Sequence, residues 1–133
     1  MPYNLMVLGS RLPGVTHEEF KRRYERHISE VIPPLCKATN AMPLSHLRHY
    51  ISHSSSTAEG VDEPVVLFDH EGSTHYDVVV RMAFEDEAAS QRFMAAVSTE
   101  EAARIVAEDE AGFWDRSRMQ VVVLGGVEET KRG

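Results

Sequence analysis

The order in which apolar patterns follow one another constrains the fold of this chain more than any other feature. Apolar or alternating segments at residues 3–8, 44–53, 77–84 and 119–124 predict four β-strands. One helical repeat lies between the first two strands, and two helical repeats lie between the last two. The resulting order is β-α-β, a long loop, then β-α-α-β. It predicts an α+β domain built as a ferredoxin-like split βαβ unit.

The first predicted helix carries a histidine on its apolar face. Thr16 and Glu19 form a capping box at its start. Large side chains then recur at the spacing of one helix face: Phe20, Tyr24, His27, Ile28 and Val31. Pro33 and Pro34 predict the end of this helix. His27 is therefore expected to point inward.

The second half of the chain predicts two helices in succession. Asp86 is placed as the N-cap of the first of them, and Ser98 with Glu101 forms a capping box for the second. The second helix is expected to run to about Trp114. Four of its residues share one side: Ala102, Val106, Asp109 and Phe113.

Helices on one face of the predicted sheet leave the other face apolar and exposed, which soluble monomers avoid. A homodimer whose two sheets face each other is therefore expected. We assign residues 1–126 to a single domain and residues 127–133 to a polar tail. The connection over residues 54–76 is long enough to act as a lid, and residues 65–68 within it are compatible with a short extra strand.

Composition excludes several classes of function. No window approaches 18 consecutive apolar residues, so no membrane span is expected. The start of the chain lacks a signal-peptide pattern, and the single cysteine, Cys36, cannot form an internal disulfide, so a cytoplasmic location is expected. The net charge of −7 argues against nucleic-acid binding, which needs clustered cations.

Familiar cofactor motifs are missing from the sequence. It contains no phosphate loop, no dinucleotide fingerprint, no nucleophile elbow and no paired cysteines. His46 and His49 are spaced as His-x-x-His, but on a strand this spacing puts the two rings on opposite faces. No metal site is therefore expected.

Three residues stand out as candidates for chemistry, each with an alternative role. His27 is either a core histidine hydrogen-bonded to the backbone or a general acid/base in a pocket. Asp115 lies at a predicted helix end, where the helix dipole disfavours a carboxylate. It is either solvated or paired with a nearby arginine or histidine. Trp114 is expected to pack in the core, to lie at the dimer surface or to stack on a ligand.

The remaining histidines divide into two groups. His49 and His53 share a predicted strand face. If that face meets the helices, both line the same cavity as His27. If it meets the partner subunit, they are interface residues. The other histidines are expected in loops or on the surface: His17, His46, His70 and His75.

Three segments, taken in order, resemble the EthD-like family: residues 16–27, 47–53 and 107–115. The resemblance implies a dimeric α+β barrel with a ligand pocket between the sheet and the helices of each subunit. It also implies the absence of an organic cofactor or metal. The match is most similar to fungal members of polyketide pathways. By this match, His27 takes the place of the family's helix histidine, Asp115 its terminal acid and His53 its strand-end histidine.

The resemblance leads to the expectation of a cofactor-free lyase, a decarboxylase acting on an aromatic polyketide-derived carboxylic acid in secondary metabolite biosynthesis. His27 would donate a proton and Asp115 would orient it. The residues expected to contact the small aromatic substrate are Tyr24, His49, His53 and Trp114. Three alternatives remain: a polyketide cyclase, dehydratase or isomerase; a non-catalytic dimeric binding protein for hydrophobic ligands; and a cofactor-free oxygenase.

Overall fold

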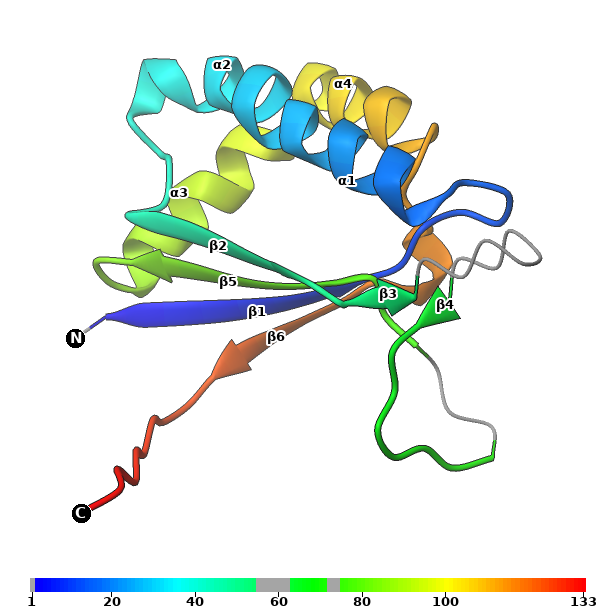
Figure 1. The fold of residues 1–133 in the computed structure, drawn as a ribbon. Coiled ribbons are helices and arrows are strands. Elements are labelled where there is room, and N and C mark those ends of the chain that lie inside the picture. Colours follow the sequence, from blue (N-terminus) through cyan, green and yellow to red (C-terminus); the bar gives the residue numbers. More distant parts are fainter. Residues whose placement is uncertain (1, 55–62, 72–74) are drawn as a thin grey trace.

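A four-stranded antiparallel sheet forms the base of the protein (Figure 1). The computed structural model describes residues 2–54, 63–71 and 75–133. The strands β1 (Tyr3–Gly9), β2 (Ser45–Tyr50), β5 (Val78–Phe84) and β6 (Gln120–Leu124) are arranged in the order β2-β5-β1-β6. Every neighbouring pair is antiparallel. This is the ferredoxin-like arrangement, so the α+β fold predicted for the chain is confirmed.

The helices α1 (His17–Arg26), α3 (Glu87–Val97) and α4 (Glu100–Glu110) lie on one face of this sheet (Figure 1). Strand β5 shows the division most clearly, because its residues alternate between buried and less buried. Most of the largest fully buried side chains come from the sheet, from α1 and from the segment after α4, and the full set is Ser10, Phe20, Cys36, Val78, Val80, Phe84 and Phe113. The core therefore lies between the sheet and the helices.

Local hydrogen bonds explain where α1 and α3 begin. The Thr16 hydroxyl accepts from the backbone N–H of Glu19 at 3.1 Å. The Asp86 carboxylate accepts from the N–H of Ala89 at 2.8 Å. Each side chain satisfies an N–H group that has no partner within the helix. Both predicted starts are confirmed.

The prediction for α4 was wrong at both ends. Its N-cap is Thr99, whose hydroxyl accepts from the N–H of Ala102 at 3.1 Å. Ser98 instead ends α3. The helix stops at Glu110, and the chain then turns before it reaches Trp114. Two adjacent hydroxyl residues both offered a cap, and the one that suits the backbone turn between the helices was used.

The first helix does not stop at the two prolines, contrary to prediction. A π-helical turn, η1 (His27–Val31), follows α1 directly and leads into α2 (Ile32–Cys36). The N–H of Ile32 donates to the carbonyl of His27, five residues earlier. The prolines then fall in the first turn of α2, where an N–H group is not needed. A short 3₁₀ turn, η2 (Lys37–Thr39), ends the run.

The predicted strand over residues 44–53 is divided in two. Strand β2 ends at Tyr50, and a separate short strand, β3 (His53–Ser54), pairs with β4 (Glu63–Pro64). Residues 65–68 form no strand. The predicted lid includes residues 55–62 and 72–74, which lie outside the described residues. After β6, residues 125–133 have no regular secondary structure. None of the helices described is long and apolar enough to cross a membrane.

Candidate functional site

A cavity of about 170 Å³ lies between the sheet and the helices. Most of its lining is apolar, with β1 and β5 supplying Val7 and Met82. Five side chains bring polar atoms to this lining: Tyr24, His27, His46, Glu110 and Trp114. An apolar hollow with a few converging polar groups is the usual form of a small-molecule site.

His27 is the central polar residue of this pocket. Its side chain is only 3% exposed, and its Nδ1 lies 2.6 Å from Oδ2 of Asp109 on α4. An ionised carboxylate can only accept, so Nδ1 of His27 carries the hydrogen. In the neutral ring Nε2 then bears the lone pair, 3.8 Å from Oε2 of Glu110. This nitrogen is therefore placed to exchange a proton.

Glu110 is a second acid at the same pocket. Burial raises the pKa of its carboxyl, although His27 and Arg116 act in the opposite direction. The Nε of Arg116 lies 3.1 Å from Oε1 of Glu110. A raised pKa keeps the carboxyl protonated to a higher pH, where it can donate a hydrogen bond or a proton. The pocket thus holds two neighbouring groups capable of proton transfer.

Aromatic rings form one wall of the pocket. The centroids of Tyr24 and Trp114 are 4.9 Å apart, and those of Tyr24 and His27 are 6.2 Å apart. The indole N–H of Trp114 points to Sδ of Met119 at 3.2 Å. Gly9 lies directly against the indole, where a Cβ atom would clash with the ring. Burial raises the pKa of Tyr24, so its hydroxyl stays neutral. The wall therefore offers flat apolar surfaces to a planar ligand.

His46 lines the same pocket from β2, although it was expected on the surface. The alternation of β2 turns His46, Arg48 and Tyr50 toward the helices. Burial, with the neighbouring Arg48, lowers the pKa of His46 to about 4. The ring is consequently neutral at physiological pH.

The lowered pKa of His46 predicts a loss of stability in acid. The unfolded chain protonates this ring near pH 6.5, whereas the folded protein resists protonation until about pH 4. The stabilising contribution is therefore present above pH 6.5 and is lost as the pH falls toward 4. Between pH 7 and 4.5, wild type should lose about 1–3 kcal/mol more unfolding free energy than His46→Gln, allowing for partial exposure of the ring. Urea unfolding at the two pH values measures this difference. His70→Gln, at an exposed position, should behave like wild type, and an equal loss in His46→Gln would contradict the prediction.

The structure brings together three of the residues singled out from sequence, namely Tyr24, His27 and Trp114. Asp115 is not among them. Its carboxylate accepts from the N–H and the hydroxyl of Ser117, at 3.1 and 2.6 Å, and so caps the 3₁₀ turn η3 (Arg116–Arg118). The prediction that Asp115 orients His27 was wrong, because α4 ends earlier than expected. Asp109 takes that position.

The two strand histidines do not line this pocket. His49 is exposed on the opposite face of the sheet, where it pairs in register with Val79. His53 lies beyond the break after β2, with its Nε2 3.1 Å from Oδ1 of Asp77. The expectation that both line the cavity of His27 was therefore wrong: the alternation of β2 turns His49 to the opposite face, and the break after β2 separates His53 from that strand.

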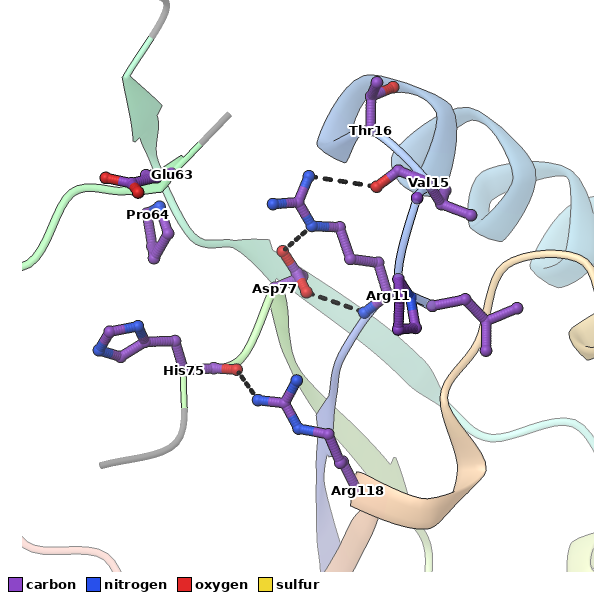
Figure 2. Close-up of a pocket in the computed structure, with 11 residues that line it drawn as sticks. Arg11, Val15, Thr16, Glu63, Pro64, His75, Asp77 and Arg118 are labelled. Atoms are coloured by element: carbon purple, nitrogen blue, oxygen red, sulfur yellow. Dashed lines mark hydrogen bonds and ion pairs between the residues drawn. The ribbon is translucent and has the colours of Figure 1, made fainter. Parts of the chain in front are cut away.

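A larger and more polar hollow, of about 560 Å³, lies near the end of β1. Figure 2 shows Arg11 and Asp77 facing each other across its wall, with Arg118 reaching the carbonyl of His75. The N–H of Arg11 donates to Oδ2 of Asp77 at 2.8 Å. This hollow shares no lining residue with the His27 pocket.

The fold and the pocket define an α+β protein of the ferredoxin-like type, with a buried histidine–carboxylate pair beneath its helices. Residues 12–117 match the model of the EthD domain. The chain belongs to the EthD domain family. A comparison with curated proteins gave no match.

Several solved structures share the fold at low sequence identity. A Pseudomonas aeruginosa protein is 15% identical, with 96% of this chain and 95% of that chain covered and a TM-score of 0.50. A Bacillus halodurans protein of the ethyl tert-butyl ether d (EthD) family is 14% identical, with 96% and 100% covered and a TM-score of 0.49. A dimeric Bacteroides fragilis protein with a ferredoxin-like fold is 12% identical, with 92% and 94% covered and a TM-score of 0.49. Likeness at this level concerns the fold alone.

Proposed function

We propose that the chain is a cofactor-free decarboxylase acting on an aromatic polyketide-derived carboxylic acid in secondary metabolite biosynthesis. The observation that carries this proposal is the buried His27, with Nδ1 held by Asp109 and Nε2 directed to an apolar pocket. A histidine held in one tautomer by a carboxylate is a common form of general acid/base.

The geometry supports a simple sequence of bond changes. The protonated His27 transfers a proton from Nε2 to the ring carbon that bears the carboxylate. The bond from this carbon to the carboxylate then breaks, its electron pair restores the aromatic ring, and carbon dioxide leaves. Asp109 stabilises the positive imidazolium before the transfer. Because the transferred proton stays on the product, Glu110 can supply a new proton to Nε2 and then take one up from water. The apolar lining favours neutral carbon dioxide over the carboxylate.

The size of the pocket indicates how such a substrate would lie. Cavities of about 150 Å³ hold a single benzene ring, so about 170 Å³ accommodates the reacting ring alone. Three lining residues are partly exposed and mark the opening of the pocket: Met42, Met94 and Val121. Further fused rings would lie against these side chains, which include two adaptable methionines.

Product masses from a panel of one-, two- and three-ring hydroxyaryl carboxylic acids test the proposal. The expected result is loss of carbon dioxide, with one deuterium on the vacated carbon when the reaction runs in deuterated water. Loss of water, or a rearranged product of unchanged mass, would contradict decarboxylation and indicate a cyclase, dehydratase or isomerase that uses the same histidine. Oxygen consumption would indicate an oxygenase. Tight binding of the aromatic acids without turnover would indicate a non-catalytic binding protein.

We also infer that two copies pair through the uncovered face of the sheet. Figure 1 shows the helices on the other face only. The uncovered face carries a group of apolar side chains: Met6, Leu8, Leu47, Val79 and Val122. Leu47 and Val122 are 40% and 43% exposed in the single chain. Structures of the same fold from Bacteroides fragilis and Thermobifida fusca are described as dimeric.

Charges placed on this face should separate the dimer. Wild type is expected to have a mass near twice 15.0 kDa by light scattering, and Leu47→Asp with Val122→Asp a mass near that of one chain. Leu47 lies in register with Arg81, whereas Met6 separates Val122 from that arginine, so the carboxylate at position 122 has no cation beside it in register. Burying such a carboxylate at an interface costs several kcal/mol, enough to raise the dissociation constant by about 100-fold or more. Val127→Asp, in the exposed tail, is the matched control. A monomeric wild type at micromolar concentration would overturn the inference.

A further inference from the structure

A second group of titratable side chains lies apart from the His27 pocket, at the end of the sheet where β1 leads into α1. It joins the first residue of α1, His17, with His53 of β3 and Asp77, which immediately precedes β5. Oδ1 of Asp77 lies 3.5 Å from Nδ1 of His17 and 3.1 Å from Nε2 of His53. The three ligand-type atoms all lie within 4.8 Å of one another. The side chains are largely buried, and that of His53 is 6% exposed.

The hydrogen bonding of His53 determines which of its nitrogens is available. Its Nδ1 lies 2.7 Å from the carbonyl of Ile51, and a carbonyl can only accept, so Nδ1 is the donor. In the neutral ring, Nε2 therefore carries a lone pair that faces a carboxylate oxygen. Within the described part of the chain, Nε2 forms no hydrogen bond. Two acceptors facing each other in a buried site require a positive centre between them, either a proton on the ring or a cation.

The arrangement of the two imidazoles favours a cation. Their rings stack with centroids 3.6 Å apart and planes 17° apart, so two protonated rings would place like charges in contact. A cation held between neutral rings avoids this repulsion, and neutral imidazole is the form that binds metals. Ligands about 2.0–2.1 Å from a tetrahedral ion are separated by about 3.3–3.4 Å. The distances of 3.1 and 3.5 Å to Asp77 bracket this value.

We propose that Nδ1 of His17, Nε2 of His53 and Oδ1 of Asp77 bind a divalent transition-metal ion such as Zn²⁺. The surrounding groups resemble the outer shell of such sites, in which a backbone carbonyl orients a histidine and a hydrogen bond orients a carboxylate. The carbonyl of Ile51 orients His53 by accepting from its Nδ1. The N–H of Arg11 orients Asp77 by donating to its Oδ2. The Nε of Arg11 also lies 3.5 Å from Oδ1, so the ion shares this carboxylate with an arginine.

The cluster adjoins the polar hollow of about 560 Å³, since Asp77 belongs to both (Figure 2). With three protein ligands, the fourth position is open to water or a ligand.

Zinc titration of the tag-free 133-residue protein tests the proposal by calorimetry. Wild type is expected to bind one ion per chain. His17→Ala and His53→Ala should each weaken binding by at least about tenfold. His70→Ala removes an exposed histidine outside the cluster and should bind like wild type. Circular dichroism checks that each variant is folded.

Nuclear magnetic resonance of the histidine ring nitrogens in wild type provides a test that needs no variant. Zinc should shift Nε2 of His53 and Nδ1 of His17, with a change in the ring environment of His17, and leave His70 unchanged. Absence of zinc binding would overturn the proposal. So would equal affinity in all three variants, or a His53 ring protonated on both nitrogens at neutral pH and insensitive to zinc. These outcomes are independent of decarboxylation, since the cluster and the His27 pocket have no residue in common.

Discussion

Replacement of His27 by alanine is expected to lower kcat for decarboxylation by about 10²–10⁴-fold, the usual loss when a positioned acid/base is removed. Nε2 of this residue is the nitrogen of the His27–Asp109 pair that faces the pocket, so no water molecule held by the apolar lining would replace it efficiently. The rate is measured by carbon dioxide release at saturating substrate. A change confined to KM would indicate that His27 only binds the substrate.

Two further variants make this experiment specific. His27→Asn keeps a side chain that can donate to Asp109 but cannot transfer a proton at neutral pH, so it should be as slow as His27→Ala. His70→Ala should retain the wild-type rate, because this residue is exposed and lies outside the pocket. Full activity in folded His27→Asn would remove His27 from the mechanism, whatever the reaction proves to be.

The carboxylate partner of His27 gives the second large effect. Asp109→Asn should lower kcat by about 10²-fold or more, because a neutral amide cannot stabilise the imidazolium; the corresponding change in a serine protease triad costs about 10⁴. The matched control is Asp115→Asn, six residues further along the chain. Asp115 caps η3 and does not contact His27, so kcat should remain within about twofold. Asparagine caps a helix about as well as aspartate, so the unfolding free energy should also change little, whereas Asp115→Ala should reduce it by about 0.5–2 kcal/mol.

Comparison of the two variants shows whether the catalytic partner of His27 is Asp109, as in the structure, or Asp115, as predicted from sequence. If Asp115→Asn is the slower enzyme, the pairing of His27 with Asp109 is not the catalytic arrangement. If both variants are as active as wild type, the histidine acts without a carboxylate. Chemical denaturation of both variants establishes whether a rate effect accompanies a loss of stability.

Features determined by near neighbours could be predicted from sequence. The caps at Thr16 and Asp86 are hydrogen bonds to an N–H group three residues away, so the residues that form them are adjacent in the chain. The inward orientation of His27 follows from helix periodicity in the same way. Asp109 had a similar signal, as an acid on the apolar side of its helix with Val106. That signal alone does not identify a partner.

The sequence by itself determined the order of elements, the α+β class and the buried histidine, because local hydrogen bonding and burial patterns encode all three. Only the tertiary structure decided which acid meets that histidine. Asp109 is 82 residues from His27 and contacts it because α4 packs against the π-helical turn. The cluster of His17, His53 and Asp77 likewise depends on the break after β2. Tertiary packing produces this cluster, and no spacing in the chain predicts it. Contacts between distant residues depend on how the elements pack, which periodicity does not specify.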